Sequence, residues 1–256
     1  MGDLLRVDDV SVRFGGVVAL NRLSFTVEEG QMCALIGPNG AGKTTLFNVI
    51  SRLYEPTEGR VTFADQDLLA APPHRIAKLG IARTFQNVAL FPGLSVRDNV
   101  LMGAFSDTHS GFLASTVRWP GAVREERASR AAADGLLEEL ELSPYADHPA
   151  AGLAYGTLKR VELARALASN PSLLMLDEPA TGLTHGEVNQ LADLVRQVRD
   201  ERGLTVLLVE HHMNMVMRIA ERIVVLDYGA KFAEGDPDTV RNDPRVIEAY
   251  LGAGNS

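Results

Sequence analysis

Residues 37–44 read Gly-Pro-Asn-Gly-Ala-Gly-Lys-Thr and directly follow the apolar run Met32–Ile36. The pattern is G-x-x-x-x-G-K-[ST] between an expected strand and an expected helix, the context that a phosphate-binding loop requires. Glycines let the backbone curl with its N–H groups toward phosphate oxygens, and the start of the helix adds positive potential. The residues predicted to hold phosphate are Gly37, Pro38, Asn39, Gly40, Ala41, Gly42, Lys43, Thr44 and Thr45.

Two side chains of this loop have specific expected roles. Lys43 is expected to reach the β- and γ-phosphates of a nucleotide, and the Thr44 hydroxyl is expected to ligate Mg²⁺. Apolar residues at helical spacing follow as far as Leu53, which predicts a helix with one face against a sheet. This flanking strand and helix favour a phosphate loop over a chance glycine-rich turn.

A second apolar run, residues 173–176, stops at the acidic pair Asp177 and Glu178. Strands of a parallel sheet end at the edge where ligands bind, so acids placed there face the nucleotide. We expect Asp177 to hold Mg²⁺ through its water shell and Glu178 to orient or deprotonate the attacking water. The alternative to a catalytic role is that Asp177 merely caps a helix and that Glu178 is a solvated surface residue.

Short apolar runs alternate with helical patterns, which predicts an α/β fold with a mostly parallel sheet. Short pieces with tight glycine breaks before Met32 predict a small antiparallel β section. Strand signals vanish from about Pro92 to Pro149, which predicts an inserted helical lobe. The other expected elements are strands at 6–10, 17–20, 23–27, 59–63, 172–176, 205–209 and 222–227, and helices at 123–142, 185–202 and 213–220.

Helix starts are marked late in the chain. Thr184 with Glu187 three residues later is typical of a capping box. Asp236 and Asp243 each precede a proline, which predicts two further N-caps. Gly252 is the expected end of the last helix.

Composition excludes several classes of protein. The chain has 256 residues, 46% hydrophobic and 23% charged, an ordinary globular composition. Its formal charge of −8 weighs against nucleic acid as a partner. Cys33 is the single cysteine, so no internal disulfide and no cysteine-based metal site can form. The first ten residues lack a secretory pattern, and no apolar run approaches the roughly 18 residues of a membrane span.

The two motifs and residues 153–167, Leu-Ala-Tyr-Gly-Thr-Leu-Lys-Arg-Val-Glu-Leu-Ala-Arg-Ala-Leu, together resemble the ABC-type ATPases. Motif order and spacing agree over residues 4–251. The resemblance implies a P-loop NTPase core formed by residues 1–91 and 168–256. Residues 92–167 would form the helical lobe that carries the signature segment. The resemblance also implies ATP hydrolysis with Mg²⁺ as cofactor.

The resemblance assigns further site residues. Gln86 matches the glutamine that binds the catalytic metal and contacts the membrane partner, and His211 matches the histidine switch. Residues 180–183 match the loop after the acidic strand. Phe14 falls where the family stacks adenine on an aromatic ring, although by itself it fits a core position equally well.

The signature segment departs from the family pattern. The family has Leu-Ser-Gly-Gly-Gln, whereas this chain has Leu153-Ala154-Tyr155-Gly156-Thr157. Ala154 removes the hydroxyl that helps hold the γ-phosphate bound to the opposite subunit, and Tyr155 adds bulk beside the backbone. We expect either a weaker contact between subunits or one made by backbone N–H groups alone.

The Ala-Tyr-Gly sequence resembles the ATP-binding subunits of branched-chain amino-acid importers, as do a longer lobe at about residues 106–124 and the tail at 241–252. Thr157 departs from the glutamine usual there. The resemblance implies a homo- or heterodimer with another ABC ATPase, multispanning permease subunits and, indirectly, a periplasmic binding protein. It implies a peripheral position on the cytoplasmic face of a bacterial inner membrane. The alternatives are the ATPase of an exporter or of a transporter of amides, urea or lipids, a soluble ABC ATPase, and a non-hydrolysing module. Glu178 and His211 oppose the last of these.

Overall fold

The computed structural model describes residues 2–84, 89–104 and 120–252. Its larger sheet has the strand order β10-β9-β3-β8-β7-β6, parallel throughout except for β10, which runs antiparallel to β9. Every residue of β3, β7 and β8 is buried, as expected for apolar strands covered on both faces. The strands are β3 Met32–Ile36, β6 Ile81–Arg83, β7 Leu173–Asp177, β8 Thr205–Val209, β9 Arg222–Asp227 and β10 Ala230–Gly235.

Among the helices that cover this sheet, α6 and α8 begin at caps that the sequence predicts. The Thr184 hydroxyl and the Glu187 carboxylate cap each other's backbone at the start of α6, which confirms the capping box. The Asp236 carboxylate accepts from the backbone N–H of Thr239 at the start of α8. These helices are α1 Lys43–Ile50, α6 His185–Arg202, α7 Met213–Ile219, α8 Pro237–Arg241 and α9 Pro244–Gly252.

The smaller sheet is antiparallel, with the order β2-β1-β4-β5. The two short pieces expected at 17–20 and 23–27 are wrong as separate strands, because they form one strand, β2 Val17–Glu28. Its pairing with β1 shifts register near Arg22, whose φ is +48° and whose N–H bonds to the Ser11 hydroxyl at 3.1 Å. A bulge therefore explains the break in the sequence pattern. The other strands are β1 Asp3–Phe14, β4 Glu58–Phe63 and β5 Gln66–Asp67.

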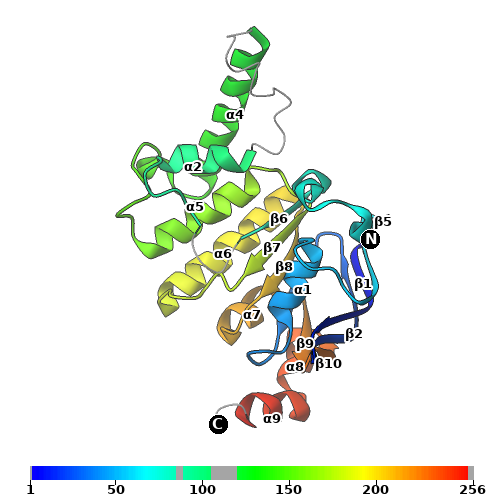
Figure 1. Ribbon diagram of the computed structural model, residues 1–256. Coiled ribbons are helices and arrows are strands. Elements are labelled where there is room, and N and C mark those ends of the chain that lie inside the picture. Colours follow the sequence, from blue (N-terminus) through cyan, green and yellow to red (C-terminus); the bar gives the residue numbers. More distant parts are fainter. Residues whose placement is uncertain (1, 85–88, 105–119, 253–256) are drawn as a thin grey trace.

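Three helices gather at one end of the molecule, opposite α9 (Figure 1). The helix expected at 123–142 spans 120–139 instead, because Glu141 takes a φ of +57° and ends the helical path. The lobe shares one buried apolar cluster with β7, β8 and α6. Most of the longer segment expected at 106–124 lies outside the described residues. The elements are α2 Val96–Gly103, α4 Pro120–Glu139, η5 Ser143–Tyr145 and α5 Tyr155–Leu167, with the 3₁₀ turns η1 Leu68–Ala70, η2 Pro73–Arg75 and η3 Ala77–Leu79 before β6.

Within the described ranges, none of the helices has the length and apolar character needed to cross a bilayer.

Candidate active site

The phosphate loop connects β3 to α1 through backbone conformations that favour glycine. Gly37, Gly40 and Gly42 have φ angles of +151°, +82° and +100°. A Cβ atom on Gly42 would lie 2.5 Å from the Ala19 carbonyl oxygen, and one on Gly37 would overlap the Leu226 carbonyl. The curled loop is therefore specified by backbone packing on two sides, which keeps its N–H groups in place.

Helix α1 begins directly after this loop without a side-chain cap and without an acidic residue in its first turn. Its first N–H groups and the positive end of its dipole favour an anion. Thr44 is exposed and Thr45 half-buried at this helix start. The helix therefore presents a hydroxyl group and positive potential at the same point.

Lys43 is buried within the loop, with 6% of its surface exposed. Its Nζ donates to the carbonyl oxygens of Gly37, at 2.7 Å, and Pro38, at 2.9 Å. Burial lowers the pKa of Lys43 below its ordinary value, while the charges of Glu178 and Asp177 act to raise it. The lysine thus lies in the electrostatic range of both predicted acids, which brings the two motifs into one site.

Asp177 is the last residue of β7, and its carboxylate is 5% exposed. The Arg83 guanidinium donates to its Oδ2 at 2.7 Å. The same guanidinium bonds to Asn48 Oδ1 at 2.8 Å and to Ser51 Oγ at 3.1 Å, both at the end of α1. Arg83 thereby compensates the charge of a buried acid.

No motif in the sequence assigns a role to Arg83. The available signal was a basic residue just before Thr84, in the segment that leads to Gln86. That position alone did not reveal a partner 94 residues away. Gln86 itself lies outside the described residues.

Glu178 follows β7 with a φ of +47°, a conformation that is rare for residues with a side chain. Its N–H donates to the Val209 carbonyl at 2.8 Å, which ties it to the end of β8. Its Oε2 accepts from the Thr181 hydroxyl at 3.4 Å and lies 3.9 Å from Nδ1 of His211. The structure therefore brings the predicted base and the predicted histidine switch into contact distance.

Phe14 ends β1, and 47% of its surface is exposed. Its ring meets the Tyr54 ring edge-on at a centroid distance of 5.1 Å. The alternative that Phe14 belongs to the core is therefore wrong. Phe14 and Tyr54 therefore form an exposed aromatic pair.

The signature segment forms the start of α5. Ala154 is its N-cap and makes no side-chain capping bond. Tyr155 packs against Gly182 of the 180–183 loop, where an added Cβ would lie 2.8 Å from the ring. A Cβ atom added to Gly156 would lie 2.8 Å from the Glu187 carboxylate. The extra bulk of Tyr155 is thus accommodated by a glycine of the loop that follows Glu178.

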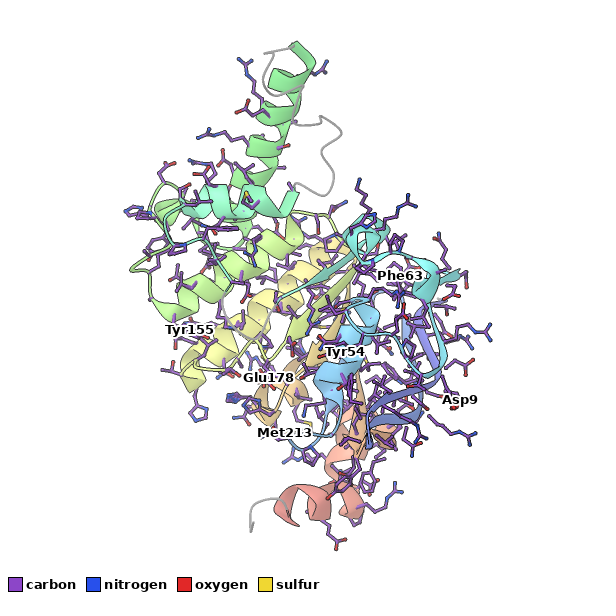
Figure 2. The ribbon with its side chains drawn as sticks, in the orientation of Figure 1. Asp9, Tyr54, Phe63, Tyr155, Glu178 and Met213 are labelled. Carbon is purple, nitrogen blue, oxygen red and sulfur yellow. The ribbon has the colours of Figure 1, made fainter. Side chains whose placement is uncertain are left out.

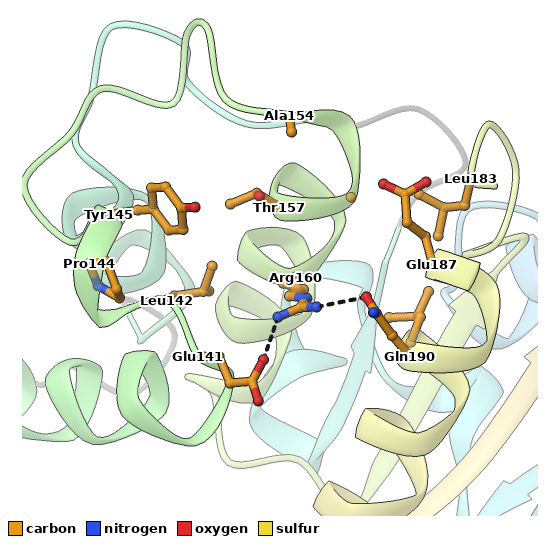
Figure 3. A pocket seen from close by; sticks show the side chains of 12 residues that line it. Glu141, Leu142, Pro144, Tyr145, Ala154, Thr157, Arg160, Leu183, Glu187 and Gln190 are labelled. Carbon is orange, nitrogen blue, oxygen red and sulfur yellow. Dashed lines mark hydrogen bonds and ion pairs between the residues drawn. The ribbon is translucent and has the colours of Figure 1, made fainter. Parts of the chain in front are cut away.

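A cavity of about 310 Å³ lies beside the signature segment, between the lobe and α6. Arg160 donates across it to Glu141 at 2.8 Å and to Gln190 at 3.3 Å (Figure 3). These bonds hold α5 to its neighbours by side chains alone. In the view of Figure 2, Tyr155 lies to one side of Glu178 and Tyr54 to the other.

Comparisons with known proteins identify the family of this chain. The sequence pattern of the family described as "ABC transporter" matches residues 20–181. A pattern described as "Branched-chain amino acid ATP-binding cassette transporter" matches residues 230–255.

The chain is 43% identical to the high-affinity branched-chain amino acid transport ATP-binding protein BraF of Pseudomonas aeruginosa, over 97% of this chain and 98% of that protein. It is 40% identical to the high-affinity branched-chain amino acid transport ATP-binding protein LivG of Escherichia coli, over 97% of this chain and 98% of that protein. A crystal structure of the ADP conformation of the ATP-binding cassette MJ1267 superposes with a TM-score of 0.86 at 32% identity, covering 98% of this chain and all of that one.

Such cassettes form dimers and work with membrane permeases. The chain belongs to the ABC transporter family, as an ATP-binding cassette whose ATP hydrolysis is coupled to transport.

Proposed function

We propose that this cassette energises the uptake of branched-chain amino acids. The observation that carries the proposal is the similarity, at 40–43% identity over 97% of the chain, to ATP-binding proteins of that transport class. The match of residues 230–255 to the branched-chain pattern supports it independently of the ATPase motifs. A transporter of amides, urea or lipids would leave that tail unexplained.

We assign the triphosphate of ATP to the phosphate loop and Mg²⁺ to Thr44 and Asp177. The donor set suits Mg²⁺, because it consists of hydroxyl and carboxylate oxygens. When bound, Mg²⁺ would offset the negative charge of the phosphates. The uncapped start of α1 and the buried Lys43 support the same placement of the phosphates.

We assign Glu178 as the base that orients water and accepts its proton. Its carboxylate is only 18% exposed, which keeps bulk water from competing for it. His211 is the neighbour that would contact the γ-phosphate and steady Glu178, because its Nδ1 lies 3.9 Å from the carboxylate. Gln86 and Phe14 keep the roles that the resemblance implies, metal and permease contact for the first and adenine stacking for the second.

We infer a head-to-tail dimer, homo- or heteromeric, in which the signature segment of one subunit completes the site of the other. Tyr155 is 40% exposed at the start of α5, and Ala154 leaves this helix start uncapped. Both features suit a surface that meets a phosphate across an interface. The cassette MJ0796, whose dimer was crystallised in a post-hydrolysis state, is 28% identical to this chain, with a TM-score of 0.76 over 91% of this chain and 98% of that one.

A groove of about 480 Å³ between the core and the lobe is our candidate for permease docking. Exposed apolar residues line it, with Leu53 at 59%, Phe91 at 48% and Met102 at 41% exposure. Such a patch is typical of a surface that is covered by a partner. A multispanning permease docked there would place the cassette on the cytoplasmic face of a membrane, with a periplasmic binding protein acting on the far side.

Uptake by the reconstituted transporter tests the proposal. The tagged cassette should co-purify from membranes with multispanning subunits, and these should take up leucine, isoleucine or valine in an ATP-dependent way. Uptake of only amides or urea, or recovery with ribosomes, would contradict it. Glu178→Gln should abolish uptake while the complex still assembles.

A matched pair of variants tests the docking groove. Phe91→Asp should release the permease, whereas Ile247→Asp, equally exposed at 45% but on α9, should not. Equal recovery of permease with both variants would move the docking surface elsewhere.

A further inference from the structure

Glu210 is a fully buried carboxylate between the two loops that flank Glu178. It follows β8, immediately before His211, and none of its surface is exposed. Its Oε1 accepts from the backbone N–H of Ala180 at 2.9 Å. Its Oε2 accepts from the backbone N–H groups of His211 and His212, each at 2.7 Å.

These bonds connect segments that are distant in sequence. Ala180 begins the loop after Glu178, and His211 begins the loop after the neighbouring strand. The strands themselves are in register up to the pair Asp177 and Val209, and beyond that point the pairing ends. Glu210 thus continues the connection between the two loops where the sheet no longer provides it.

The energy of this arrangement depends on all three donors. An ionised carboxylate taken out of water is costly unless its oxygens are hydrogen-bonded, and charge-assisted bonds of this length are the strong ones. Because both oxygens are used, a change in either loop would leave part of the charge unsatisfied. The hydrogen bonds to Glu210 therefore stabilise one relative position of the two loops.

His211 lies between two carboxylates as a result. Its Nδ1 is 3.7 Å from Glu210 Oε2 and 3.9 Å from Glu178 Oε2. A shift of the loop would change the distance between the ring and the proposed base. The position of the histidine therefore depends on Glu210 through the main chain as well as through the ring.

We propose that Glu210 is a positioning residue for hydrolysis, one that holds His211 and the 180–183 loop in fixed relation to Glu178. This rests on the proposed roles of Glu178 and His211. Glu210 touches no substrate in this scheme and acts through the two loops. Its loss should slow turnover without weakening the binding of ATP.

Glu210→Gln tests this with little change in volume. The amide has one acceptor oxygen, so it can serve Ala180 or the two histidines but not both sides. We expect kcat to fall about 10- to 100-fold, because small misplacements of catalytic groups cost that much. The Kd for ATP, measured by calorimetry on the purified cassette, should stay within about twofold, since the phosphate loop is untouched.

Thr205→Val is the matched control at the opposite end of β8. Thr205 is also fully buried, and its hydroxyl accepts from the Gly30 N–H at 2.8 Å. The substitution removes a buried hydrogen bond from the same strand and should lower the melting temperature without lowering kcat. If both variants lose stability and neither loses turnover, Glu210 is merely structural and the proposal is wrong.

A double-mutant cycle separates positioning from a general loss of order. If Glu210 acts through His211, then Glu210→Gln should cost little further turnover in a His211→Ala background. Fully additive losses would contradict the action of Glu210 through His211. Should Glu210→Gln fail to fold, Glu210→Asp keeps the charge but shortens the reach, and it should show the same selective loss of kcat.

Glu178→Gln serves as the reference. If it leaves turnover intact, the proposed base is wrong, and with it the basis of this inference. If it abolishes turnover while Glu210→Gln does not reduce it, only the positioning role is wrong.

Discussion

The phosphate loop and the signature segment approach the same site, but they are built in different ways. The phosphate loop depends on backbone packing, because a Cβ on Gly42 would meet the Ala19 carbonyl oxygen. The signature segment depends on side chains, with Tyr155 against Gly182 and Arg160 bonded to neighbouring elements.

This difference has a physical consequence. A loop whose backbone packs directly against the backbone of neighbouring strands has almost no freedom to accept other residues, so its sequence is strongly restricted. A segment held by side chains can change its sequence if its neighbours change with it. The departures at Ala154 and Tyr155 occur in the segment of the second kind.

The largest contrast between the two regions should appear in stability. Arg83→Leu leaves the buried Asp177 without its guanidinium and should lower the free energy of unfolding by about 3–5 kcal/mol. Arg160→Leu breaks a lobe pair whose glutamate is 75% exposed, so it should cost less than about 1 kcal/mol. Urea denaturation of both variants measures the difference, and equal losses would remove the contrast.

Adding a methyl group to the phosphate loop should have the next largest effect. Gly42→Ala should weaken ATP binding at least about tenfold, because the left-handed conformation is strained and the new carbon overlaps backbone. Gly40→Ala carries similar strain at φ +82° but faces open space, so its loss should be clearly smaller. Calorimetric Kd values for ATP compare the two, and equal affinities would show that packing does not define this loop.

The stability of the protein at alkaline pH reports on β3, the strand that leads into the phosphate loop and contains Cys33. Burial raises the pKa of the Cys33 thiol from 9.0 to about 12, with Arg222 acting to lower it. The unfolded chain therefore loses this proton first, so stability should be unaffected below pH 9 and should decline above it, by at most about 1.4 kcal/mol per pH unit.

Lys43 opposes this trend. Because the pKa of Lys43 is lowered in the folded chain, the folded chain loses the lysine proton at a lower pH than the unfolded chain does. This titration alone therefore makes the folded state more stable as the pH increases toward 10.5. Cys33→Ala isolates the thiol, because only the wild-type chain should show the additional decline. Parallel stability curves for the two proteins between pH 8 and 10 would show that the thiol titrates normally.

The same contrast explains what could be predicted from the sequence. The buried strands β3, β7 and β8 and the phosphate loop are coded locally, by apolar runs and by glycine spacing, so they were predicted almost to the residue. The bulge at Arg22 split one strand into two expected pieces, because a local change of register interrupts the pattern without ending the strand.

Side-chain partners from distant segments could not be predicted in this way. Arg83 meets Asp177 only because β6 pairs with β7, and Tyr155 meets Gly182 only because α5 begins near the loop after Glu178. Each of these contacts depends on the order of strands and the placement of the lobe. No spacing in the sequence encodes that order.

The smallest expected effect concerns the signature segment itself. A serine introduced by Ala154→Ser would restore the family hydroxyl at a position whose φ of −58° and ψ of 146° suit a helix cap. One further hydrogen bond to phosphate across the interface is worth about 0.5–1.5 kcal/mol, so the ATP-dependent dimer should become about two- to tenfold more stable. Size-exclusion chromatography of the slowly hydrolysing Glu178→Gln background with ATP measures this.

Capping of α5 would raise the melting temperature of the isolated subunit as well, because an N-cap serine stabilises a helix by about 1 kcal/mol. A higher melting temperature with an unchanged dimer would therefore assign the hydroxyl to the helix alone. In that case backbone N–H groups would suffice for the contact between subunits, and Tyr155 would be tolerated because the loop opposite it carries Gly182.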